Sequence, residues 1–327
     1  MNRLRTLILP VLATVCITGG ESSAQEPNPD SASFYAERAS DMLVRKRYTD
    51  SRVLFQRAYA FGARSFDVHR QLGFLHSWAG ENDSAIVYLS RAVELQPTNA
   101  EVQHNLGIAY SELGQREKAI EHLEVATNLA PSNDLYLTNL GSEYARAGRI
   151  SMALPVLREA YQLNPVNAQI QFHMGSAFAT MKQYDSAETY FTKSQEHGGT
   201  TAELHYFLAV VQMRLNKLEP AKENLKKTLE LQPDHADARK ALARVYMTTR
   251  EYGEAIELYN DILAASPDDQ ESRIMQGTAY GLLNETPKAD SVLRELFAVD
   301  SSLGFQMLRM LSAARKSADS STAAGNR

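Results

Sequence analysis

Polar side chains able to bond to a peptide main chain recur every 34 residues in the middle of the sequence. They are Gln71, Asn105, Asn139 and His173. A carboxamide donates to a carbonyl and accepts from an N–H group, so consecutive amides suit an extended peptide without reading its side chains. The same amides could instead be solvated or could cap local backbone groups. Both interpretations stay open at the level of sequence.

A second set combines aromatic rings with cations. Its members are Arg146, Phe172, Tyr206, Phe207, Arg214, Lys240 and Arg244. Aromatic surface beside fixed cations forms anchor pockets at interfaces, and such pockets favour an aromatic or carboxylate-bearing segment. Phe172 and Tyr206 could instead pack against neighbouring parts of the chain. Trp78, close to Arg70, is a separate candidate contact for which burial is the default expectation.

Chemistry on a substrate has no support in the sequence. Metal-protease, phosphate-loop and nucleophile-elbow patterns do not occur, and the single cysteine is Cys16, close to the N-terminus. His69 and His76 fall at packing positions of one predicted helix, so we expect no metal there. We predict no catalytic residue, no metal and no cofactor, and an enzyme would have to rely on a side chain such as His173.

The chain divides into eight consecutive units of 34 residues without insertion or deletion, from Ala32 to Leu303. The eighth and twentieth positions of every unit are small residues, and the twenty-fourth is bulky, for example Leu123, Leu157 and Phe191. Two helices can approach closely only where neither carries a bulky side chain, so each unit predicts a pair of packed helices. The units are 32–65, 66–99, 100–133, 134–167, 168–201, 202–235, 236–269 and 270–303.

The predicted turn between the two helices of a unit has its own signature. Gly80, Gly114 and Gly148 occupy it, and Asn216 and Asn284 take the same position in later units. Glycine, and next asparagine, tolerates the left-handed backbone that ends a helix. A proline closes five of the units and stops the second helix. These prolines are Pro97, Pro131, Pro165, Pro233 and Pro267.

This pattern resembles the tetratricopeptide repeat family over residues 32–303. The best copy carries Leu106, Gly107, Tyr110, Ala119, Leu123, Ala126 and Pro131. The resemblance implies an all-α, right-handed α-solenoid of eight helix-turn-helix repeats that binds proteins. It also implies that the first helices line a concave groove, chiefly through positions two, five, six, nine, twelve and thirteen. The amides, the aromatic and basic set and Trp78 all fall at these positions.

The two ends of the chain differ from the repeats. Arg3, Arg5, the apolar run 7–17 and the small residues Ser22 and Ala24 predict a signal peptide over 1–24. A retained leader and a lipidated Cys16 stay open as alternatives. Residues 25–31 form a predicted linker, 304–316 a capping helix and 317–327 a disordered tail. We expect Phe305, Leu308 and Leu311 on the packed face of the capping helix.

These features predict a periplasmic or secreted, non-enzymatic scaffold that holds an extended peptide or partner protein in its groove. The alternative is a structural subunit of an envelope assembly or polymer-export machine that uses its outer surface and ends. A net charge of −5 makes nucleic acid a poor partner. No small-molecule substrate is expected, and a membrane is expected only with a retained leader or a lipidated Cys16. Lys222, Lys226 and Lys227 predict a solvated face.

Overall fold

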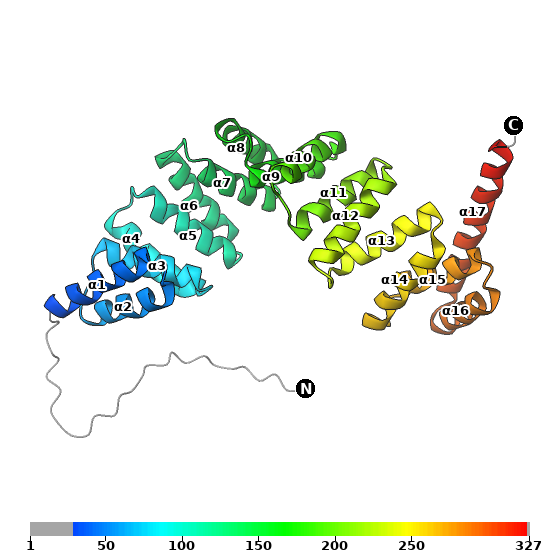
Figure 1. Ribbon diagram of the computed structural model, residues 1–327, viewed down its shortest axis with the longest axis horizontal. Helices are drawn as coiled ribbons and strands as arrows, with labels where there is room; N and C mark the ends of the chain where they lie inside the picture. The colour runs from blue at the N-terminus through cyan, green and yellow to red at the C-terminus, as the bar shows by residue number, and fades with distance from the viewer. Residues whose placement is uncertain (1–28, 326–327) are drawn as a thin grey trace, which may run out of the picture. The chain divides into compact units, whose positions relative to one another are not determined.

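The computed structural model describes residues 29–325, and these residues form 17 helices and no strand. The chain divides into two compact units, Met1–Pro97 and Thr98–Arg327. Figure 1 shows the helices following one another in pairs within each of them. The prediction of an all-α repeat solenoid is confirmed. The predicted signal peptide, 1–24, lies outside the described residues.

Each 34-residue stretch contributes one pair of helices. In unit Met1–Pro97 these are α1 (Pro29–Val44), α2 (Tyr48–Ala60), α3 (Phe66–Trp78) and α4 (Asn82–Leu95). In unit Thr98–Arg327 they are α5 (Ala100–Glu112), α6 (Arg116–Leu129), α7 (Asp134–Arg146), α8 (Ile150–Leu163), α9 (Ala168–Thr180), α10 (Tyr184–Glu196), α11 (Ala202–Arg214), α12 (Leu218–Leu231), α13 (Ala236–Thr249), α14 (Tyr252–Ala265), α15 (Gln270–Leu282) and α16 (Thr286–Val299). The single helix α17 (Ser301–Gly325) follows the last pair. Within residues 29–325 no helix combines the length and the apolar character needed to cross a membrane.

The small eighth residue of a unit meets its bulky twenty-fourth residue. A Cβ atom added to Gly141 would lie 2.6 Å from Cγ of Leu157, and one added to Gly175 would lie 2.7 Å from Cδ1 of Phe191. Both of these bulky side chains are fully buried. The two helices of a repeat therefore approach each other at the place that the sequence predicted.

Side-chain caps begin most of the first helices. Asn99, Asn133 and Asn167 each accept a hydrogen bond from a backbone N–H in the first turn that follows. Ser65 and Thr201 do the same through their hydroxyls. Such a cap satisfies one of the N–H groups that a helix start leaves unpaired. The polar residue that ends a repeat thus fixes where the next first helix, and its groove-facing residues, begin.

The turn between paired helices contains a left-handed residue in every repeat. The φ angles are +71° at Gly114 and +57° at Asn216, as the sequence predicted for glycine and asparagine at this position. The same conformation occurs at Lys46, Lys182 and Arg250, although the Cβ atom of these residues disfavours it. Three turns therefore carry local backbone strain that the glycine turns avoid.

Replacing Lys182 by glycine is expected to raise the free energy of unfolding by about 0.5–1 kcal/mol, because glycine adopts this φ of +59° without a Cβ penalty. Lys182 is exposed, so little packing is lost. Urea unfolding followed by circular dichroism measures the change. The matched reverse variant, Gly114→Lys, should lose stability by a similar amount. A Lys182→Gly variant less stable than the parent would contradict the strain argument.

Tyr259 carries a buried hydroxyl that forms no hydrogen bond with any of the described residues. The side chain is 2% exposed, and burial raises the pKa of its phenol well above the ordinary value. The equivalent position of other repeats holds Phe55 and Phe191. Because an unsatisfied buried hydroxyl costs about 1 kcal/mol or more, Tyr259→Phe is expected to stabilise the protein by about that amount. If calorimetry shows that Tyr259→Phe melts at a lower temperature than the native chain, the prediction is wrong and the hydroxyl has a hydrogen-bond partner.

The C-terminal helix differs from the prediction in length and in its packed face. Helix α17 runs from Ser301 to Gly325, beyond the capping helix expected over 304–316 and into the expected tail. Met307 is buried and faces the room left by Gly277, and Leu311 lies against Gly281.

The prediction for the capping face is therefore wrong for two of its three residues. Phe305 and Leu308 are 57% and 40% exposed. Gly277 and Gly281 of α15 leave room for Met307 and Leu311 of α17, because the two helices can approach closely only at these glycines. At the other end of the chain α1 already begins at Pro29, inside the expected linker 25–31.

Candidate functional site

The predicted groove residues all lie on the first helices of their repeats. Gln71 and Trp78 belong to α3, in unit Met1–Pro97. Trp78 is 55% exposed and its ring lies 4.9 Å from that of Tyr48, so the expectation of burial is wrong for this residue. The other ten lie in unit Thr98–Arg327: Asn105 on α5, Asn139 and Arg146 on α7, Phe172 and His173 on α9, Tyr206, Phe207 and Arg214 on α11, and Lys240 and Arg244 on α13.

A histidine that the sequence did not single out joins the two asparagines. Nδ1 of His104 lies 3.3 Å from Oδ1 of Asn105, and Nε2 of the same ring lies 2.8 Å from Nδ2 of Asn139. Both asparagine side chains are half-buried. We call these three residues the amide bridge. The two amides are therefore partly satisfied by the side chain of His104, which contacts amides of two successive repeats, and not by the local backbone groups that the alternative interpretation named.

His104 is held in place by its surroundings. Its ring stacks on Tyr136 with centroids 4.4 Å apart, and only 7% of the residue is exposed. Burial lowers the pKa of His104. The contact with Asn105 and the charge of Glu101 raise this pKa, but by less than burial lowers it. A buried neutral imidazole has one donor and one acceptor nitrogen. One donor and one acceptor nitrogen match the two contacts of the amide bridge.

Side chains of three successive first helices converge on one cleft of about 480 Å³, which we call the central cleft. Arg146 comes from α7, Phe172 and His173 from α9, and Glu203 and Phe207 from α11. These helices start 34 residues apart in the sequence, so only stacking of the repeats brings their side chains together. The central cleft has an aromatic wall, a cation and a carboxylate.

The rings of the central cleft rest on the core. Phe172 lies 5.7 Å from Phe191 and 6.1 Å from Phe207, measured between ring centroids. Phe191 is completely buried, whereas Phe172 and Phe207 are half-buried. The two rings therefore pack against a neighbouring repeat and still present surface to the cleft. The packing interpretation therefore applies to Phe172, and its role as an anchor stays a prediction.

A buried carboxylate positions the cation of the central cleft. Glu143, 4% exposed, accepts hydrogen bonds from Ser111 Oγ at 2.7 Å and from Arg146 Nη1 at 2.9 Å. The Arg146 side chain itself is 54% exposed. Its guanidinium is thus anchored at one edge by α5 and α7 and open to solvent at the other.

His173 is neutral at physiological pH. Burial, and next the nearby guanidinium of Arg146, lowers its pKa from 6.5 to about 4. A neutral imidazole at this position can donate one hydrogen bond and accept one. His173 therefore continues the polar row begun by Asn105 and Asn139 without adding charge.

A second cleft of about 400 Å³ lies between α11 and α13 and is called here the second cleft. It is lined by Tyr206 and Arg214 from α11 and by Asp237, Lys240 and Arg244 from α13. All four residues predicted here from sequence are thus brought together. The sequence missed Asp237, whose carboxylate adds a negative charge to the set.

The cations of the second cleft are not equally available. Lys240 forms an ion pair with Asp269 at 2.5 Å, and Arg244 forms one with Glu271 at 2.5 Å. Among residues whose side chains are described, Arg214 has no ion-pair partner, and it is exposed. Arg214 is therefore the cation that can meet an incoming carboxylate without breaking a contact.

Three sequence-family models, each described as tetratricopeptide repeat, match residues 64–132, 138–199 and 212–277. The chain belongs to the tetratricopeptide repeat family. The fold of this family mediates the binding of proteins or peptides. No curated protein matched the sequence.

Solved structures with the same repeat fold include three with comparable similarity. The APC/C hetero-tetramer Cut9–Hcn1 aligns with a TM-score of 0.56 at 18% identity, over 76% of this chain and 56% of that one. PilF of Pseudomonas aeruginosa gives 0.58 at 21%, over 64% and 96%. A tetratricopeptide repeat protein from Parabacteroides merdae gives 0.57 at 14%, over 76% and 98%. At these identities the likeness is one of fold alone. This chain spans only 56% of the length of the Cut9–Hcn1 chain.

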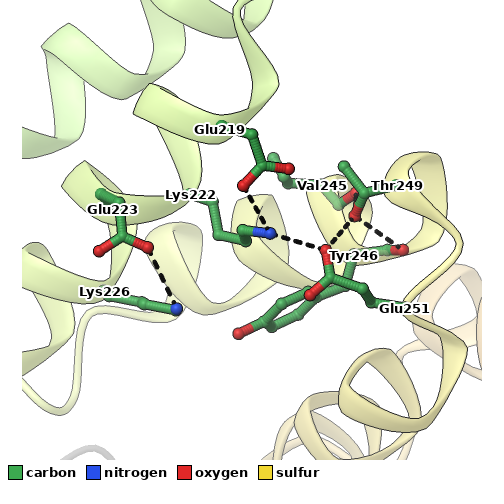
Figure 2. A network of polar contacts seen from close by, with 8 residues as sticks. All are labelled: Glu219, Lys222, Glu223, Lys226, Val245, Tyr246, Thr249 and Glu251. Carbon is green, nitrogen blue, oxygen red and sulfur yellow. Dashed lines mark hydrogen bonds and ion pairs between the residues drawn. The ribbon is translucent and has the colours of Figure 1, made fainter.

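One lysine of this tetratricopeptide repeat array joins two repeats instead of facing solvent. Figure 2 shows the ammonium of Lys222 between Glu219 and Glu251. The ion-pair distances from its Nζ are 2.8 Å to Glu219 and 2.7 Å to Glu251. Thr249 Oγ1 donates to the same carboxylate of Glu251 at 2.7 Å. Lys222 is 8% exposed, so the predicted solvated face is wrong at this position. Lys226 is half-buried and Lys227 is exposed, each beside a glutamate of its own helix.

Three polar residues of the candidate site were not singled out from the sequence. His104 and Asp237 occupy positions five and two of their units, which are groove positions, and Glu143 lies three residues before Arg146. A usable signal for Glu143 was its place, with Arg146, on one face of a helix. Within the described side chains no cluster of three or more His, Cys, Asp or Glu residues is arranged to hold a metal ion.

Proposed function

We propose that this tetratricopeptide repeat protein is a non-enzymatic scaffold of the periplasm or cell envelope. Its first helices α5, α7, α9, α11 and α13 hold an extended peptide, or an extended segment of a partner protein. The observation that carries the proposal is the central cleft, where residues of three successive repeats present rings, a cation and a carboxylate. Such a mixture suits peptide side chains, and the neighbouring amides suit a peptide main chain.

The polarity of the clefts narrows the kind of peptide. Arg146 in the central cleft and Arg214 in the second cleft each leave donor groups open to solvent, and half-buried rings lie beside both. A segment with an acidic residue close to an aromatic or aliphatic one would satisfy cation and ring together. Glu203 would favour a basic or polar residue between them.

The location is proposed from the leader sequence. The basic start, the apolar run 7–17 and the small residues before Gln25 support export and cleavage after Ala24. N-terminal sequencing of the protein from an envelope fraction tests this. A mature chain that begins at Gln25 supports the proposal, and a chain that begins at Met1 and stays in the cytosolic fraction contradicts it.

Binding in the groove is tested by affinity capture from an envelope extract, with the double variant Asn105→Ala and Asn139→Ala beside the native chain. Captured partners are identified by mass spectrometry, and their affinity is then measured by calorimetry. The matched control is Asn128→Ala with Gln162→Ala. These exposed amides also lie 34 residues apart, but on the second helices α6 and α8.

Loss of a partner from the Asn105 and Asn139 variant, with unchanged helical content and full retention by the control variant, supports the groove. Equal affinity of all three proteins would move the binding surface elsewhere. Hydrolysis or transfer catalysed by the purified chain and abolished by His173→Ala would contradict the non-enzymatic part of the proposal.

A second candidate function uses the C-terminal end. Phe297 and Val299, at the end of α16, and Phe305 and Leu308 on α17 are 37–61% exposed, and the two phenylalanine rings lie 5.2 Å apart. Exposed apolar side chains gathered at one end of a protein are typical of an interaction surface. It favours the alternative of a structural subunit that assembles through its end.

Substitution of this surface separates the two candidates. Phe305→Ser with Leu308→Ser leaves the packed residues Met307 and Leu311 in place, so the fold should persist. If this variant alone loses assembly into its complex while the Asn105 and Asn139 variant keeps it, the structural role is the correct one. The reverse pattern supports the groove.

A further inference from the structure

We infer that His104 is a positioning residue that sets the orientation of two groove amides, so that the groove offers a peptide a donor at Asn105 and an acceptor at Asn139. The inference rests on the proposed function and deepens it. It concerns recognition of the ligand's main chain, and it assigns a role to a side chain that is nearly hidden from the groove.

With the two amides oriented as they are in the structure, the contacts of the amide bridge fit one arrangement of hydrogens. Nδ2 of Asn139 can only donate, so Nε2 of His104, 2.8 Å away, must accept. The proton of the neutral imidazole then resides on Nδ1, which donates to Oδ1 of Asn105 at 3.3 Å. One tautomer satisfies both amides.

The orientation of each amide follows from the end that His104 holds. Asn105 uses its oxygen inward, so its NH₂ group is left to donate outward. Asn139 uses its nitrogen inward, so its carbonyl oxygen is left to accept outward. Among the described residues neither of these outward groups has a protein partner. They match the C=O and N–H groups of an extended peptide.

Protonation of His104 would destroy this arrangement. An imidazolium donates from both nitrogens, so Nε2–H would face the NH₂ group of Asn139, donor against donor. The amide of Asn139 would have to turn over and present its NH₂ group to the groove. Peptide affinity should therefore fall as the pH falls below the ordinary histidine range.

Few charged or titratable groups surround the ring. Glu101, on the same helix, favours the charged form, as does the contact with Asn105, while burial opposes it more strongly. The group that faces His104 from α7, apart from Asn139, is the phenol ring of Tyr136, whose own pKa is raised by burial. Tyr136 is thus uncharged over the range in which His104 titrates. The ring is neutral at physiological pH, as the bridge requires.

Two substitutions at one position separate positioning from packing. In His104→Phe the ring that stacks on Tyr136 is kept and both hydrogen bonds are lost. In His104→Gln the side chain offers one acceptor and one donor again but has no titratable group. The probe is a pool of random decapeptides that contain Asp and Glu but no His, acetylated and amidated at their ends, because carboxyls stay largely ionised down to about pH 5. Affinity is measured from neutral pH to about pH 5.

We expect His104→Phe to bind the pool about tenfold more weakly than the native chain, which corresponds to one hydrogen bond or two. His104→Gln should retain the native affinity within about threefold and lose its pH dependence. The nitrogen chemical shifts of His104, assigned with these variants, should identify Nδ1 as the protonated nitrogen at neutral pH. Unchanged circular dichroism excludes unfolding as the cause.

The outcomes distinguish the inference from the function on which it rests. If Asn105→Ala with Asn139→Ala loses the pool but His104→Phe binds as the native chain does, the groove is right and the role of His104 is wrong. A protonated Nε2 in the neutral ring would also overturn that role. If the double asparagine variant binds the pool as tightly as the native chain does, the groove proposal fails and the recognition role of His104 fails with it.

Discussion

Replacing Leu157 by alanine is expected to lower the free energy of unfolding by about 3–4 kcal/mol. The side chain is completely buried and fills the space above Gly141, where the two helices of a repeat are too close for other atoms to move in. Such a site cannot collapse around the cavity, so the loss should lie well above the lower end of the range of about 2–5 kcal/mol for leucine-to-alanine changes. Urea unfolding followed by circular dichroism measures the loss.

The matched control lies on the same helix. Leu163, at the end of α8, is 47% exposed, and its replacement by alanine should change stability by no more than about 0.5 kcal/mol. Because a repeat contacts only its neighbours, the unfolding transition of Leu157→Ala should also become less cooperative. A loss below about 1 kcal/mol would show that the repeat can repack, and would contradict the close contact.

Stability should fall as the pH drops from 6.5 to 4, with His173 as the main single cause. Its folded pKa of about 4 is below the ordinary 6.5, so in this window the unfolded chain binds a proton that the folded chain does not. The free energy of unfolding therefore decreases toward acid, by up to about 3 kcal/mol from this residue. Above pH 6.5 both states are neutral here and the effect vanishes.

The variant His173→Gln should flatten this dependence and leave stability at neutral pH nearly unchanged. Proton NMR of the ring, assigned by comparison with the variant, gives the pKa directly. The pH profiles of native and variant chains then differ only in the acid window. Titration of His173 close to 6.5, or parallel profiles for the two proteins, would disprove the expected burial of the ring beside Arg146.

The repeat architecture could be predicted in detail, because it depends on contacts that recur within every unit. Gly141 and Leu157 are 16 residues apart in one unit, so their contact repeats with the period and is visible as a pattern. The left-handed turns at Gly114 and Asn216 were predicted for the same reason. A local backbone requirement of this kind restricts the residue type and is therefore visible in the sequence.

Several candidate residues were located correctly but their bonding was not predictable. Lys240 and Arg244 line the second cleft as expected, yet Lys240 is paired with Asp269 at the end of its own repeat and Arg244 with Glu271 of the following one. Lys222 was expected in solvent and is enclosed by Glu219 and Glu251. A period tells which face a residue occupies, but the partner of a long charged side chain depends on the stacking of the next repeat.

The sequence by itself determined the helix pairs, their close contact points, their turns and the row of first-helix positions that holds Asn105 and Asn139. Each of these follows from residue size, backbone tolerance and a period of 34. Only the tertiary structure decided that His104 links the two amides, that Ser111 of the preceding repeat donates to Glu143, and that α17 leaves Phe305 exposed. Those features depend on distances between side chains of different repeats. A hydrogen bond forms or fails within a few tenths of an ångström, which no spacing in the sequence specifies.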